Sequence, residues 1–95
     1  MYELSIKKAA AKAIARQSPA VRAQMVADLD ALAANPDDPA LDTEPVGGTD
    51  YRRLKFRNPA RDFRAIYSQD DGIRVIGVKA VEPRGQAYDV RRLQR

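Results

Sequence analysis

The sequence contains no cysteine and no histidine. Without cysteine there is no disulfide framework, no thiol nucleophile and no thiolate ligand for a metal. Without histidine the usual proton carrier near neutral pH is missing, and so are Ser-His-Asp mechanisms and histidine-ligated zinc sites. If the protein is an enzyme, its acid–base chemistry must rely on Lys, Tyr, Asp or Glu, with Arg as electrostatic support.

Long apolar segments are missing as well. The longest unbroken apolar run has four residues, 31–34, whereas a transmembrane helix needs about 20. Residues 1–6 lack the basic and then apolar layout of a signal peptide. We therefore expect a cytoplasmic protein with no membrane partner. A length of 95 residues predicts one domain, 1–95, with a modest core.

The charge is distributed unevenly along the chain. Residues 1–49 carry five Lys and Arg against seven acidic residues, whereas residues 50–95 carry twelve against six. Ten of the twelve are arginines, whose planar and permanently charged fork matches phosphate oxygens. A basic second half on a small domain indicates a polyanionic partner, most simply nucleic acid. A solvated arginine-rich surface is the alternative explanation.

The first half has the pattern of one strand and two helices. Residues 2–6 alternate apolar and polar side chains, which predicts a short strand. Residues 7–17 are rich in alanine and predict a first helix. A second helix is predicted from Ser18-Pro19, an N-cap and first-turn proline, to the stop at Asn35-Pro36. Its apolar stripe consists of Val21, Met25, Leu29 and Leu32, and Ala9, Ala10 and Ala13 of the first helix allow close packing.

The second half has the pattern of a strand meander. The predicted strands are 51–57, 63–68 and 73–81, with turns at 58–60 and 70–72, a connecting loop at 36–49, a break at 82–85 and one or two helical turns within 86–95. The predicted order is thus β-α-α-β-β-β. We expect an α+β fold with an antiparallel sheet and a helical hairpin packed on one face, which leaves the other face for chemistry.

That second face is predicted to gather cations. Alternation within 51–57 places Leu54 and Phe56 on one side and Arg53 and Lys55 on the other, with Tyr51 and Arg57 extending a basic, aromatic-edged stripe. Arg64 lies in the next strand, and Arg84 and Tyr88 follow the third. A meander places these strands side by side, so the residues can converge.

Such a group suits the cleavage of RNA. RNA carries its own nucleophile, the 2′-hydroxyl, and a protein can align it with the adjacent phosphate and stabilise the developing charge. Guanidinium groups suit the phosphate, and a lysine or a tyrosine can move the protons. This chemistry requires neither a metal nor a cofactor.

These segments also carry a family resemblance, through three motifs: Tyr51-Arg52-Arg53-Leu54-Lys55-Phe56, Asp62-Phe63-Arg64-Ala65-Ile66-Tyr67 and Pro83-Arg84-Gly85-Gln86-Ala87-Tyr88. In this order and spacing the chain resembles the RelE/ParE superfamily of bacterial toxins over essentially its whole length. The resemblance implies a RelE-like toxin of a type II toxin–antitoxin pair, which enters the ribosomal A site and cleaves mRNA without metal, leaving a 2′,3′-cyclic phosphate. It also implies a cognate antitoxin as partner.

The resemblance further implies roles for individual residues. Lys55 or Tyr88 would transfer protons, and Arg64 and Arg84 would stabilise the phosphate in the transition state. Arg53 would position the substrate, and the basic stripe in the sequence adds Arg57 as a second substrate-binding residue. Arg53 stands where lysine is common in the RelE branch, and arginine is a poorer proton carrier.

Several alternatives remain open at this point. In the ParE-like branch the same scaffold poisons DNA gyrase without nuclease activity, and a non-enzymatic nucleic-acid-binding module is a third possibility. Arg64 could instead pair with Asp62 or Glu82, Tyr88 could pin the tail to the core, and Arg53 and Lys55 could form an ordinary solvated strand face.

Overall fold

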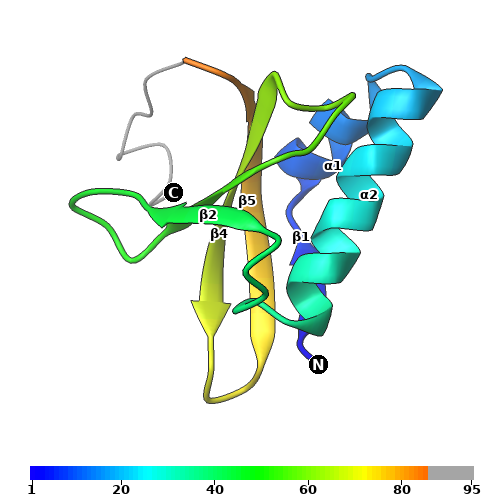
Figure 1. Cartoon of the computed structure of the whole chain (residues 1–95). Helices are drawn as coiled ribbons and strands as arrows, with labels where there is room; N and C mark the ends of the chain where they lie inside the picture. The colour runs from blue at the N-terminus through cyan, green and yellow to red at the C-terminus, as the bar shows by residue number, and fades with distance from the viewer. Residues whose placement is uncertain (86–95) are drawn as a thin grey trace.

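The computed structural model describes residues 1–85. Its elements are β1 (Glu3–Ile6), α1 (Lys8–Ala15), α2 (Pro19–Ala34), β2 (Asp42–Pro45), β3 (Arg52–Lys55), β4 (Phe63–Asp70) and β5 (Val75–Pro83). The strands form one five-stranded sheet in the order β1-β5-β4-β3-β2. Both helices lie on the same side of this sheet (Figure 1). The predicted α+β class, with a helical hairpin on one face, is confirmed.

The core lies between the helices and that face of the sheet. The apolar stripe of α2 is confirmed, because Met25, Leu29 and Leu32 are fully buried. Ala10 of α1 is also fully buried, so its small side chain allows the close approach that the alanines predicted. The sheet contributes the buried side chains Leu54, Phe56, Ala65, Tyr67, Ile76, Val78 and Val81.

The helix boundaries follow the predicted signals closely. Ser18 occupies the N-cap position of α2 and Pro19 the first turn, although the Ser18 side chain makes no capping hydrogen bond. Asn35 ends the helix in an extended conformation, as expected for a residue that precedes a proline. No helix among residues 1–85 combines the length and the apolar character needed to cross a membrane.

Strand β2 corrects the prediction of a loop over residues 36–49. It pairs antiparallel with β3, so that Asp42 lies opposite Lys55 and Glu44 opposite Arg53. Its four residues, D-T-E-P, have little intrinsic strand propensity. Opposite charges directly across an antiparallel pair stabilise the strand, and a proline is tolerated because β2 is at the edge of the sheet.

The sheet is mixed, whereas the sequence predicted antiparallel pairing. Strand β1 pairs parallel with β5, from Glu3 opposite Val75 to Ile6 opposite Val78. The alternation of residues 2–6 predicts a strand but does not encode its direction. The helical hairpin connects β1 to the other strands, and such a crossover permits parallel pairing that a short turn does not.

The meander itself forms as predicted, with small shifts at its ends. At the β3–β4 turn the Ala60 N–H donates to the Arg57 carbonyl over 2.8 Å. At the β4–β5 turn Asp70 Oδ1 accepts the Gly72 N–H over 2.9 Å. Strand β5 begins at Val75 and not at residue 73, because Arg74 has a left-handed φ of 57° that interrupts the extended backbone. The helical turns expected within 86–95 lie outside the described residues.

Candidate functional site

The face of the sheet opposite the helices carries a cluster of cations. In β3 and β4, Leu54 and Ala65 are buried in the core, while Arg53, Lys55 and Arg64 alternate with them and lie on the other face. Lys55 and Arg64 are direct cross-strand neighbours. We call Arg53, Lys55 and Arg64 the basic row. The structure thus brings three of the predicted site residues together.

Two acidic side chains of β2 accompany the basic row. Arg53 Nη2 lies 2.8 Å from Glu44 Oε1. Lys55 Nζ lies 3.7 Å from the same Glu44 oxygen and 3.9 Å from Asp42 Oδ2. These contacts hold the two cations beside each other and partly neutralise them. The sequence alone missed the two acids because it did not predict β2.

Arg64 is held by the backbone of its own turn. Its Nη1 donates to the Arg61 carbonyl over 2.8 Å and to the Phe63 carbonyl over 2.9 Å. Both bonds use one nitrogen, so these carbonyls orient the guanidinium without occupying its whole fork. In register Arg64 lies between Lys55 of β3 and Glu82 of β5. Arg64 is therefore placed where a bound phosphate could approach both it and Lys55.

Arg57 does not join the basic row. The Arg57 N–H donates to Asp28 Oδ2 over 2.9 Å, while Nε and Nη2 donate to Asp28 Oδ1 over 2.9 and 2.7 Å. Asp28 belongs to α2 and is 1% exposed. Strand alternation ends with β3 at Lys55, so it does not determine the direction of the Arg57 side chain. The prediction that Arg57 extends the basic stripe is wrong, because its side chain pairs with Asp28. The predicted role of Arg57 in binding substrate stays a prediction.

The remaining predicted residues lie at the end of the chain. Arg84 is exposed just after β5, and its backbone N–H donates to the Asp62 carbonyl over 2.6 Å. This contact continues the β4–β5 ladder beyond the Arg64–Glu82 pair, so Arg84 follows the same edge of the meander as Arg64. Tyr88 lies outside the described residues.

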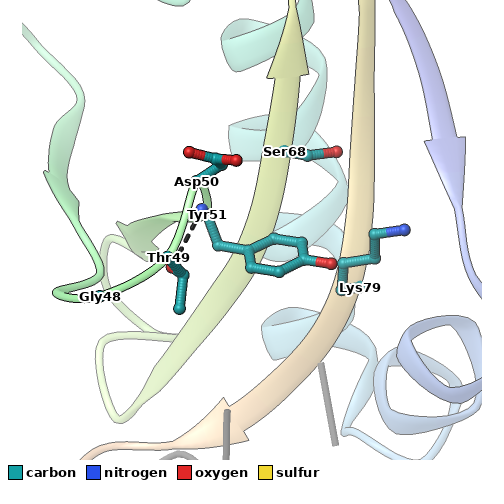
Figure 2. Close-up of a pocket in the computed structure, with 6 residues that line it drawn as sticks. All are labelled: Gly48, Thr49, Asp50, Tyr51, Ser68 and Lys79. Carbon is teal, nitrogen blue, oxygen red and sulfur yellow. Dashed lines mark hydrogen bonds between the residues drawn. The ribbon is translucent and has the colours of Figure 1, made fainter. Parts of the chain in front are cut away.

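A polar pocket is drawn in Figure 2. Its lining includes Tyr51 and Ser68, which by strand alternation share the face of Arg53 and Arg64. It has a volume of about 550 Å³ and is lined by Gly48, Thr49, Asp50, Tyr51, Ser68 and Lys79. Tyr51 lies immediately before β3, two residues from Arg53, and so extends the basic row as the sequence predicted. Lys79 is a residue that sequence reasoning missed, although a lone lysine in the apolar strand 75–81 was a signal that could have identified it.

Among residues 1–85, no group of three or more potential ligands is arranged to hold a metal ion. The basic row itself supplies guanidinium and ammonium groups, which act as hydrogen-bond donors.

Comparisons with known proteins identify the family. The family model for the ParE toxin of the type II toxin–antitoxin system parDE matches residues 5–88. Among curated protein sequences, none matches the chain.

Solved structures with the same fold agree with that match. The archaeal RelE–RelB complex from Pyrococcus horikoshii OT3 contains a chain 28% identical, with a TM-score of 0.72; the alignment covers 90% of this chain and 98% of that one. The isolated E. coli RelE toxin is 23% identical, with a TM-score of 0.70 and coverage of 96% and 92%. The intact E. coli RelBE toxin–antitoxin complex is 23% identical, with a TM-score of 0.71 and coverage of 90% and 100%.

The order of strands and helices, the basic row and the extent of the family match all agree with the resemblance found in the sequence. The chain belongs to the ParE toxin family of type II toxin–antitoxin systems, within the RelE/ParE superfamily.

Proposed function

We propose that this toxin is a metal-independent endoribonuclease that cleaves mRNA in the ribosomal A site. The observation that carries the proposal is the basic row: Lys55 and Arg64 are cross-strand neighbours, with Arg53 two residues along β3. Cations on one face can pair with a phosphodiester and with the further negative charge that develops in its transition state, and a lysine among them supplies a group that can transfer a proton. The resemblance to the RelE branch implies the ribosome as the place of action, in the cytoplasm.

The proposed reaction uses the RNA itself as nucleophile. The 2′-oxygen attacks the adjacent phosphorus and loses its proton to a base, while the bond from phosphorus to the 5′-oxygen breaks. An acid gives that leaving oxygen a proton, so the products are a 2′,3′-cyclic phosphate and a free 5′-hydroxyl. No bond change in this step calls for a metal or a cofactor.

Each residue of the basic row has a proposed role in this reaction. Lys55, in its ammonium form beside Asp42 and Glu44, is the proposed acid for the leaving oxygen. Arg64 is the proposed partner of the charge that develops on the phosphate, together with the exposed Arg84. Arg53 positions the substrate. Tyr88, outside the described residues, is the proposed second proton-transfer group.

A cognate antitoxin is the proposed second partner. The solved relatives include complexes named RelE–RelB and RelBE, and an uncontrolled nuclease in the cytoplasm would need such an inhibitor.

A reaction with purified components tests the proposal. Bacterial ribosomes programmed with a defined mRNA are incubated with the toxin in EDTA-free buffer, and primer extension maps the cuts. We expect cuts at fixed codon positions that fall at least about 100-fold in Arg64→Ala, since one electrostatic donor is worth about 10²–10³ in rate. The control, Arg22→Ala, changes an exposed arginine of α2 and should leave cleavage intact. Uncut mRNA with the wild-type toxin would contradict the proposal.

A second candidate is the poisoning of DNA gyrase, as in the ParE branch. Two observations favour it: the family model is that of a ParE toxin, and both Arg53 and Lys55 are already paired with acids of β2. A gyrase toxin has no need of free cations for catalysis. Uncut mRNA accompanied by DNA breaks would select this alternative.

A further inference from the structure

The strongest feature outside the basic row is the polar pocket around Lys79. Strand β5 has a register shift there: Ile66 pairs with Ala80, but Tyr67 pairs with Val78, so Lys79 is the extra residue of a bulge. A bulge redirects a side chain that regular alternation would place otherwise. Here Val78 and Val81 are both in the core, although strict alternation would place residues three apart on opposite faces, and Lys79 between them lies at the pocket (Figure 2).

Lys79 differs from the cations of β3 in its partners. Arg53 and Lys55 have carboxylates within 4.0 Å, whereas Lys79 makes no ion pair with any residue of the described chain. Its Nζ lies 6.0 Å from the centroid of the Tyr51 ring. Ser68 of β4 also lines the pocket and carries a hydroxyl. The pocket thus offers an ammonium and a hydroxyl to an incoming ligand.

The wall that carries Tyr51 is built by its own loop. The Thr49 hydroxyl donates to the Val46 carbonyl over 2.9 Å and accepts the Tyr51 N–H over 3.0 Å. Gly48 has a φ of 77°, a conformation that favours glycine. These contacts fix the backbone on which the Tyr51 ring is presented. Asp50 also lines the pocket, so a ligand there has one negative side chain beside it as well as the lysine.

We propose that this pocket binds one nucleotide of single-stranded RNA on the same strand as the phosphate that is cleaved, but not directly adjacent to it. Its base would stack on Tyr51 and its phosphate would contact Lys79, a combination of ring and cation suited to single strands. The site rests on the proposed ribonuclease function and would set how the mRNA runs across the sheet. From Arg64 to Ser68 the strand advances by about 13 Å, a separation that places the pocket beyond the reactive phosphate.

Binding of a non-cleavable RNA tests the role of Lys79. Binding of an eight-nucleotide 2′-O-methyl RNA to the full chain is followed by fluorescence anisotropy between 50 and 200 mM salt. One phosphate contact on a single strand contributes about 0.7 to the slope of log K against log salt. Lys79→Met should therefore bind about eightfold more weakly than wild type at 50 mM salt. Between 50 and 200 mM salt, the factor by which its affinity falls should be about 2.6-fold smaller than the factor for wild type.

The matched control is Lys12→Met, which removes the same charge from an exposed position on α1. It should keep the wild-type slope. If Lys79→Met and Lys12→Met have the same affinity and slope, the pocket is not a phosphate site and the inference is overturned.

Variants of Tyr51 test the stacking. Tyr51→Leu removes the ring and should weaken binding at least about fivefold, because stacking of one base contributes about 1–3 kcal/mol. Tyr51→Phe keeps the ring and should bind within about twofold of wild type. Equal loss in both variants would contradict stacking. The binding measurement does not depend on cleavage, so its failure is distinguishable from loss of the ribonuclease activity on ribosomes.

Discussion

At the scale of single residues, Asp28 is the most unusual side chain. Asp28 is only 1% exposed, on the buried side of α2. Its carboxylate accepts hydrogen bonds from Arg57 and from Gln24 Nε2, the latter over 2.8 Å. A buried charge is tolerated only when it is paired and hydrogen-bonded. Asp28 therefore fixes the end of β3 to the helix layer, two residues after Lys55.

The expected consequence is a loss of stability when this carboxylate is removed. Asp28→Ala should lower the free energy of unfolding by about 2–3 kcal/mol, below the usual cost of breaking a buried pair because Arg57 can turn to water. Urea denaturation measures it. The control Asp30→Ala changes an exposed acid on the same helix and should cost less than about 0.5 kcal/mol. Equal stability of the two variants would contradict the anchoring role of Asp28.

A second residue pair makes stability depend on pH. The Tyr2 hydroxyl donates to Asp71 Oδ1 over 2.6 Å. This hydrogen bond raises the pKa of Tyr2 above its ordinary value of 10.0 and, with a bond from Gln69, lowers the pKa of Asp71 below 3.8. The Asp71 contribution is thus present above pH 3.8 and lost as the pH falls through the lowered value. The Tyr2 contribution is present below pH 10.0 and lost as the pH rises through the raised one.

Tyr2→Phe tests this dependence. The stability difference between wild type and Tyr2→Phe should be largest between about pH 5 and 9 and should shrink towards pH 2 and above pH 10. Thermal melts of both proteins across that range measure it. A difference that is constant with pH would mean that the hydroxyl acts only through packing.

At the scale of secondary-structure elements, β2 has the largest effect on the site. It sets Asp42 and Glu44 beside Lys55 and Arg53, and so limits how much positive charge the basic row presents on its face of the sheet. The same pairing explains why the strand forms at all from a sequence of low strand propensity.

Removing one of these acids should strengthen RNA binding. In Glu44→Gln the nearest carboxylate of Arg53 is lost, so the guanidinium can engage a phosphate. We expect about threefold to eightfold tighter binding at 50 mM salt and a salt dependence steeper by up to about 0.7. Asp30→Asn removes an equal charge from the exposed face of α2 and serves as the control. Affinity equal to that control would show that Arg53 does not contact RNA.

The helices and strands differ in how well the sequence predicted them. The helices and strands β1, β3, β4 and β5 were predictable because periods of 3.6 and 2 in apolar residues are strong local signals. Strand β2 was not, since its stability comes from opposite charges on another segment. The same reason applies to Arg57, because its partner Asp28 lies 29 residues away. The bulge at Lys79 was not predictable either, because it breaks the regular period of 2 and leaves both Val78 and Val81 in the core.

At the scale of the whole molecule, the two faces of the sheet have different tasks. The helices cover one face and bury the core (Figure 1), while the other face carries the basic row and the pocket of Lys79, which is drawn in Figure 2. The uneven charge of the sequence anticipated this division, since twelve of the 17 Lys and Arg residues lie in the second half. The gathering of Arg53, Lys55 and Arg64 was predictable from strand alternation and meander topology.

The most direct test follows mRNA and DNA in the same cells after induction of the toxin alone. Primer extension on several transcripts and gel analysis of chromosomal DNA are carried out in parallel for wild type, Arg64→Ala and Arg22→Ala. We predict codon-positioned cuts in mRNA with intact DNA for wild type and Arg22→Ala, and neither lesion for Arg64→Ala. Intact mRNA together with DNA breaks would contradict the ribonuclease proposal and identify gyrase as the target.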